Sequence, residues 1–115
     1  MTESTVTFAF YTARVRHDPD GTLWLEGRAW EDVETGQALR WIAGNLEDIE
    51  RLRQEAHNSE AHTTPLVRVD AIHCYGQHIH SLSSGVSGSL RVSVLQGPRP
   101  AVGAIELYAW SVDAP

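Results

Sequence analysis

The sequence has one cysteine, Cys74, and no lysine, so all nine basic residues are arginine. A single cysteine cannot form an internal disulfide, which favours a reducing compartment. No apolar run approaches the roughly 20 residues that a membrane-spanning helix needs. The N-terminus also lacks the basic and then apolar layout of a secretory signal. We therefore expect a cytoplasmic protein that does not act at a membrane.

Several motifs of catalysis are missing as well. The sequence contains neither the phosphate loop Gly-x-x-x-x-Gly-Lys nor the dinucleotide fingerprint Gly-x-Gly-x-x-Gly. It also lacks the Gly-x-Ser-x-Gly elbow of hydrolases and the metal motifs His-Glu-x-x-His and Cys-x-x-Cys. The chain by itself cannot be a GTPase, and a non-enzymatic role is favoured over an enzymatic one.

Basic charge is scarce relative to acidic charge. Fifteen acidic residues against nine basic ones give a formal net charge of -6. Affinity for nucleic acid depends on basic residues that face phosphates, so this balance disfavours RNA as a partner. The 115 residues predict a single domain, 1–115, which is long enough to bury a core without metal or disulfide support.

The commonest pattern in the sequence is the alternation of apolar and polar residues that is typical of β-strands. In the stretch from Leu66 to Leu95, Val67, Val69 and Ala71 alternate with polar residues, and the alternation slips between Ala71 and Ile72, as a bulge would make it. Glycines mark reversals at Tyr75-Gly76-Gln77 and Ser83-Ser84-Gly85. This predicts a meander of three strands.

Alternation recurs in the rest of the chain. In the first stretch, the residues expected to be buried change parity, from Val6, Phe8 and Phe10 to Tyr11, Ala13 and Val15. A hairpin turn follows at His17–Gly21. A last strand beside the first would close the sheet. We expect a mainly β fold, a small closed antiparallel barrel of six to seven strands that include 6–15, 22–30, 38–42 and 105–110.

One segment has helical rather than strand spacing. Its apolar residues are Ile42, Leu46, Ile49, Leu52 and Ala56. This predicts an α-helix from about Leu46 to Ala56, within an insertion at about 45–57, that closes one end or side of the barrel. Asn45 is the expected N-cap, and Glu47 can pair with Arg51 one turn later.

The order of these features resembles the β-barrel second domain of translation GTPases such as elongation factor Tu. One half of the resemblance is the segment GTLWLEGRAWEDVETGQALRW, with Gly27-Arg28-Ala29 ending one strand and Thr35-Gly36-Gln37 preceding the next. The other half is the order Val69, Ile72, Tyr75, Ile79, Gly85 and Leu90–Val94.

The resemblance spans roughly 21–95 and implies a barrel that, in larger proteins, contacts a GTPase neighbour, an RNA surface or the acceptor end of a charged tRNA. Here the barrel stands without a GTPase domain. The chain departs from the family by its longer connection between Ile42 and Leu66, which holds the predicted helix. The shared positions are structural, so no binding residue of the family carries over.

Candidate binding residues come from the second strand. Trp24, Arg28 and Trp30 fall on the face opposite Leu23 and Leu25, and aromatic residues with arginine are enriched at protein interfaces. These three residues form the predicted partner-binding surface, for another protein or for a second copy of the chain. The alternative is that each Trp packs under the helix or a terminal strand.

A second candidate site is histidine-rich. His78 and His80 share one face of a strand, and His73 lies across the turn from them. These three are the candidate ligands for zinc or iron, with Cys74 or His62 as a fourth. They could instead form a pH-sensitive surface. No other cofactor is indicated.

The sequence therefore favours a non-enzymatic binding module that recruits a protein partner or self-associates. A protein that binds a metal or a small molecule through the His73 to His80 region is the alternative. A module associated with RNA or the ribosome is a third reading, opposed by the net charge and favoured by the resemblance.

Overall fold

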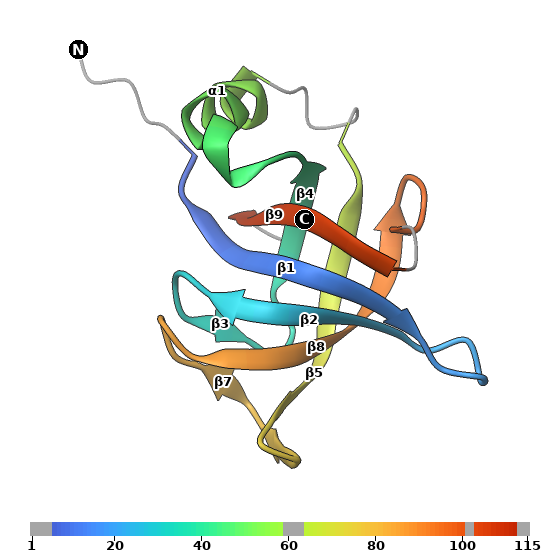
Figure 1. Ribbon diagram of the computed structural model, residues 1–115. Coiled ribbons are helices and arrows are strands. Elements are labelled where there is room, and N and C mark those ends of the chain that lie inside the picture. Colours follow the sequence, from blue (N-terminus) through green and yellow to red (C-terminus); the bar gives the residue numbers. More distant parts are fainter. Residues whose placement is uncertain (1–5, 59–63, 101–102, 113–115) are drawn as a thin grey trace.

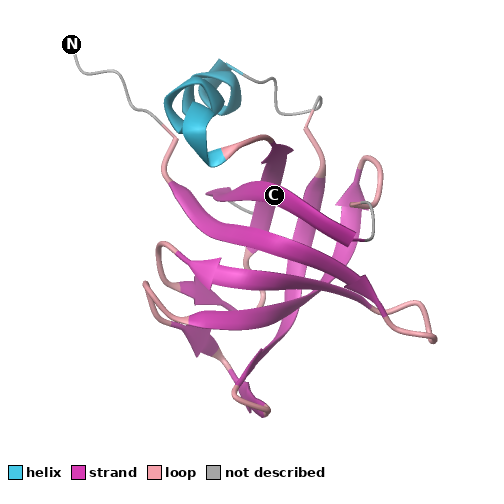
Figure 2. Ribbon diagram, viewed as in Figure 1, coloured by secondary structure: helices cyan, strands magenta, loops and turns pink. Residues whose placement is uncertain are grey.

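The computed structural model describes residues 6–58, 64–100 and 103–112, and strands make up most of it (Figure 2). The elements follow one another as β1 (Phe8–His17), β2 (Leu23–Ala29), β3 (Val33–Glu34), β4 (Ala38–Ala43), a 3-10 turn (Leu46–Asp48), α1 (Ile49–Asn58), β5 (Leu66–Cys74), β6 (Gln77–Ile79), β7 (Ser81–Leu82), β8 (Ser87–Gln96) and β9 (Gly103–Val112). The predicted mainly β fold with one inserted helix is confirmed (Figure 1).

Six strands form a closed antiparallel barrel. Their order is β4, β9, β1, β2, β8 and β5, and β5 pairs with β4 to complete the circle. The last strand, β9, lies beside β1, as the sequence predicts. Closure gives each barrel strand a neighbour on both sides. The short β6 continues from β5 through a hairpin, and β3 pairs with β7 as a separate ribbon.

The barrel interior is filled by residues at alternate positions along its strands. On β2, Leu23, Leu25 and Ala29 are buried. Burying one large apolar side chain contributes about 1.5 to 3 kcal/mol, so this interior is the main source of stability. The other strands contribute Phe10, Val15, Leu39, Val67, Val69, Ile72, Leu90, Val92, Leu107 and Ala109.

The slip in alternation that the sequence predicts in β5 is present as a shift in the pairing register of this strand. The register of β5 with β8 shifts between Val69 and Ala71, close to the slip expected between Ala71 and Ile72. Ile72 is fully buried although it lies directly after the buried Ala71. Asp70 is the extra residue of this bulge, so Ala71 pairs with the exposed Arg91, while Ile72 pairs with Leu90 and belongs to the interior cluster.

The bulge in β1 corrects one prediction. Pairing of β1 with β2 shifts between Thr12 and Arg14, so Ala13 is the extra residue. The expected buried phase of Tyr11, Ala13 and Val15 is therefore wrong in part. Val15 is buried, but Ala13 is exposed, Tyr11 is half-buried and Thr12 takes the interior position.

The helix α1 packs across the outside of β1, β4 and β9 (Figure 1). It buries Leu52 and Ala56 in a second apolar cluster with Phe8, Tyr108 and Trp110. The predicted role of the helix as a cover for one side of the barrel is confirmed. Within the ranges given above, no helix is long and apolar enough to cross a membrane.

The start of the helix differs from the prediction. Because the first turn is 3-10, with three residues per turn, Leu46 leaves the buried stripe and is 55% exposed. Asn45 stands at the N-cap position but donates and accepts no capping hydrogen bond through its side chain. Arg51 pairs with Asp48 and Glu55 instead of the expected Glu47.

Candidate functional site

A shallow groove of about 370 Å³ crosses the outer surface where β1 and β2 meet the start of β8 and the 3-10 turn. We call it the Trp30 groove. Most of its exposed lining is apolar, and the residues come from four separate segments of the chain. They are Tyr11, Ala13, Gly27, Arg28, Trp30, Leu46 and Ser87.

The groove exists because β1 and β2 approach closely at one glycine. Gly27 lies opposite Thr12 in the register, beside the bulge at Ala13. A Cβ atom at position 27 would stand 1.8 Å from the carbonyl oxygen of Tyr11, so no other residue fits without moving the backbone. Because Gly27 has no side chain and that of Ala13 is small, the floor of the groove lies below the larger side chains around it.

Aromatic rings form its wall. The rings of Tyr11 and Trp30 stack with centroids 5.9 Å apart and planes 12° apart. Behind them lies the fully buried Tyr108, whose ring centroid is 5.3 Å from that of Tyr11 and 5.7 Å from that of Trp30. Tyr108 belongs to the second apolar cluster and supports Trp30 from behind, so the exposed edge of Trp30 is rigid.

Two tyrosine hydroxyls share one carboxylate oxygen at the base of this wall. Tyr108 and Tyr11 both donate to Oε1 of Glu106, at 3.1 and 3.4 Å. Burial and the neighbouring Glu106 carboxylate raise the pKa of both phenols above the ordinary value. Both hydroxyls therefore stay protonated at neutral pH and hold Glu106 by donating to it.

Arg28 stands at the rim of the groove. Its Nε donates to the carbonyl oxygen of Gly85 at 3.0 Å, and the side chain is exposed. In the part of the chain that the structure describes, Arg28 forms no ion pair with a carboxylate. Its guanidinium is positioned by a backbone contact and is free to take an anionic group of a ligand.

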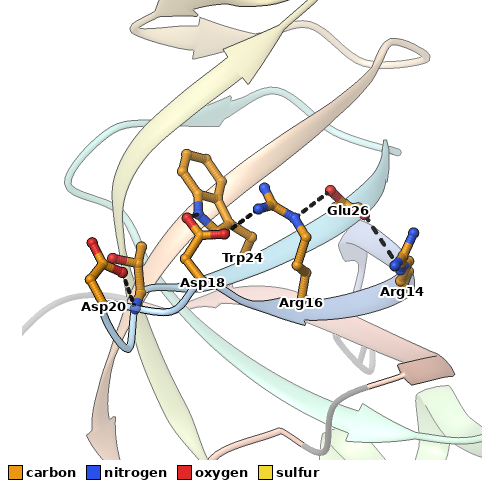
Figure 3. Close-up of polar contacts among 7 residues, drawn as sticks. Arg14, Arg16, Asp18, Asp20, Trp24 and Glu26 are labelled. Atoms are coloured by element: carbon orange, nitrogen blue, oxygen red, sulfur yellow. Dashed lines mark hydrogen bonds and ion pairs between the residues drawn. The ribbon is translucent and has the colours of Figure 1, made fainter.

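Trp24 lies apart from the groove, within a polar network (Figure 3). Its Nε1 donates to Oδ2 of Asp18 at 2.9 Å, and the guanidinium carbon of Arg16 lies 5.2 Å from its ring centroid. Arg16 also donates to Asp18 and, through Nε, to Glu26 at 3.0 Å. On the other side His73 approaches Trp24 to 4.8 Å between ring centroids.

The three predicted binding residues therefore divide between two places. Arg28 and Trp30 line the same groove, whereas Trp24 is 7% exposed and covered by Arg16 and His73. Trp30 also packs against the cluster under α1, as the alternative anticipated. Of the three residues, only Arg28 and Trp30 line the groove.

The three candidate metal ligands do approach one another. His73 and His78 are direct partners in the β5–β6 hairpin, with ring centroids 5.1 Å apart, and His78 and His80 are 6.3 Å apart. Among the described residues, however, no group of three or more His, Cys, Asp or Glu side chains has an arrangement that could hold a metal ion. Cys74 is half-buried and donates to the carbonyl oxygen of Ser87 at 3.4 Å. His62 lies outside the described residues.

Sequence reasoning missed five of the seven lining residues of the groove, and Tyr11 and Leu46 are the two with large side chains. The sequence pattern predicts Tyr11 in the barrel interior and Leu46 in the buried stripe of the helix, and both instead line the groove. The signal that could have placed Tyr11 was the bulge itself, since the extra residue reverses the phase on one side of it. No signal in the sequence marks the 3-10 turn that exposes Leu46.

Comparison with known proteins adds no relative: no family model matches the chain, and neither a curated protein nor a solved structure matches it.

Proposed function

We propose that this protein is a non-enzymatic binding module whose Trp30 groove takes an extended segment of a partner protein. One observation carries the proposal: an apolar groove with a rigid aromatic wall has at its rim an arginine that is held by a backbone carbonyl and forms no ion pair within the described ranges. Small apolar grooves with aromatic and arginine residues are the places where binding energy concentrates in protein interfaces.

The lining defines the chemistry of the segment. An apolar side chain would pack on Trp30 and the exposed Leu46, and an acidic side chain near it would pair with Arg28. A guanidinium and a carboxylate form two parallel hydrogen bonds, which fixes orientation as well as charge. A groove of about 370 Å³ holds one or two side chains, so we expect a weak, transient interaction.

Charge favours a protein segment over RNA. Two other arginines of this outer surface, Arg14 and Arg16, are already engaged by Glu26 and Asp18. A phosphate chain that followed β1 and β2 would therefore meet compensated cations, on a protein with a net charge of -6. A peptide with a single carboxylate needs only Arg28.

The resemblance to the second domain of translation GTPases supports a role in contacting another macromolecule, and we retain it as part of the proposal. It is also the feature that favours RNA, so the experiment has to separate the two. We place the interaction in the cytoplasm on the ground of the single cysteine.

The test begins with affinity purification of the tagged protein from its native host, with and without RNase. Each protein that is retained is then purified and its binding measured directly. Arg28→Gln and Leu46→Asp should each weaken this binding, because both side chains lie on the groove surface and neither supports the core. Loss of one charge-assisted pair raises the Kd by about tenfold.

Two matched variants control for charge and for surface polarity. Arg51→Gln removes the same charge from an exposed site on α1, and Leu95→Asp alters another exposed leucine outside the groove. Both should bind like the wild type. Retention that disappears with RNase would replace the proposal with RNA association, and a concentration-dependent dimer broken by Leu46→Asp would make the partner a second copy of the chain.

A further inference from the structure

A second, polar pocket lies at the opposite end of β2 from the Trp30 groove. It has a volume of about 550 Å³ and is formed by the turn between β1 and β2, by β8, and by the loop after β8. Its lining includes Leu23 at the start of β2, whereas the groove uses Gly27 and Arg28 near the end. The two sites share no residue.

Two arginines that line this pocket form no ion pair with a carboxylate among the described residues, although Arg91 is near enough to Asp20 to lower its pKa. Arg99 reaches back across the pocket, and its Nη2 donates to the carbonyl oxygen of Gly21 at 2.9 Å. Arg91 is exposed on the outer face of β8, beside Trp24 in the register. Ion pairs within the described ranges engage Arg14, Arg16, Arg51, Arg53 and Arg68, but neither Arg91 nor Arg99.

The two acidic residues of the pocket differ in their remaining capacity to accept hydrogen bonds from a ligand. Asp70 accepts from Arg68 Nε at 2.9 Å with one oxygen and from the hydroxyl of Ser93 with the other, so its charge is compensated locally. Asp20 accepts the backbone N–H of Thr22, at 2.9 Å, through Oδ1, and it also interacts with the side chain of Thr22. Hydrogen bonds from Thr22 lower the pKa of Asp20, which is therefore ionised at neutral pH and can accept a further hydrogen bond.

We propose that this pocket binds a small organic anion that also carries a hydrogen-bond donor. Its phosphate or carboxylate group lies between Arg91 and Arg99, and Asp20 accepts from a hydroxyl or ammonium group of the same molecule. Guanidinium groups suit both anions because their planar fork matches two oxygens at once. Polyanions are disfavoured because Asp20 and Asp70 also line the pocket.

The proposal is tested by two-dimensional amide NMR of the full chain at constant ionic strength. The probes are inorganic phosphate, glycerol phosphate and lactate, titrated into the millimolar range. We expect saturable shifts at Thr22, Arg91 and Ser93. Glycerol phosphate should bind more tightly than inorganic phosphate because its hydroxyl can donate to Asp20 while its phosphate group stays between Arg91 and Arg99, and comparison with lactate shows whether phosphate or carboxylate is preferred.

Three variants assign the binding to named groups. Arg91→Gln and Arg99→Gln should each weaken the binding of glycerol phosphate by about tenfold. Asp20→Asn should retain inorganic phosphate but abolish the advantage of glycerol phosphate. Arg51→Gln carries the same change in net charge at a distant site and should bind like the wild type. The dispersed spectrum of each variant shows that it is folded.

Absence of saturable shifts with all three probes would overturn the proposal. Equal weakening in Arg51→Gln and Arg91→Gln would overturn it too, because the attraction would then depend on net charge alone. Since the pocket and the groove share no residue, Arg91→Gln should leave partner binding at the Trp30 groove unchanged, and the two proposals can fail separately.

Discussion

The carbonyl oxygen of Tyr11 occupies the space where a Cβ atom of residue 27 would stand, 1.8 Å away, so Gly27 and the β1 bulge fit together as one feature. This contact places the floor of the Trp30 groove and the register of β1 on β2. Its removal should therefore affect both stability and binding.

Gly27→Ala should destabilise the protein by more than about 3 kcal/mol, because the backbone of β1 has to move. Gly88 is the cross-strand partner of Gly27 and provides the control. A Cβ there would lie 3.0 Å from the nearest atom, so Gly88→Ala should cost only about 1 kcal/mol. Urea unfolding of the two variants measures the difference, and equal losses would contradict the close approach of β1 and β2.

Trp24 should behave as a core residue. Because it is 7% exposed and packs between Arg16 and His73, Trp24→Ala should lower the free energy of unfolding by about 3 kcal/mol. Trp24→Phe retains most of the packing but loses the bond to Asp18, at a cost of about 1 kcal/mol. If Trp24→Ala folded normally and lost partner binding instead, the sequence-based interface would be restored.

Tyr75 at the tip of the β5–β6 hairpin should be replaceable with a gain in stability. Its φ of 54° is unfavourable for a bulky side chain, and the side chain is 94% exposed. Tyr75→Asn should stabilise the fold by about 1 kcal/mol, because Asn-Gly suits this two-residue turn. Tyr75→Phe keeps the strain and should change nothing. A loss of stability in Tyr75→Asn would indicate that the ring makes a contact that the exposure does not reveal.

Stability should fall at alkaline pH through Tyr11 and Tyr108. Their pKa values are higher in the folded protein than in the unfolded chain, so the unfolded state releases these protons first. The stabilisation is complete below pH about 10 and is lost as the pH rises above it. The chain has no lysine to titrate in the same range. Urea midpoints should therefore decline above this pH, and less steeply in Tyr108→Phe.

Metal removal should leave the protein unaffected. Although His73, His78 and His80 lie near one another, the described residues contain no group arranged to hold a metal ion. The melting temperature should be the same after dialysis against a chelator and after addition of zinc. A zinc content near one per chain, together with a zinc-induced rise in melting temperature that His78→Ala abolishes, would establish the metal-binding alternative.

The sequence by itself determined the strands, the turns and the closed barrel. Alternation with a period of two places Leu23, Leu25 and Ala29 in the barrel interior, independently of which strands lie beside them. Gly76 and Gly85 mark reversals because they have φ of 75° and 88°. These are local rules, which nearby residues suffice to satisfy. The helix over 49–58 was likewise detectable from its apolar spacing.

Only the tertiary structure decided which outward residues form a site. Trp24 lies on β2 and Trp30 directly follows it at the same parity, yet Arg16 and His73 cover the first, while the second faces a groove completed by Tyr11 and Leu46. Arg91 and Arg99 share a pocket because the loop after β8 turns back to Gly21. Such neighbours come from distant segments, and their meeting depends on the exact position of the β1 bulge, on the 3-10 turn and on the register of the paired strands, none of which a single strand encodes.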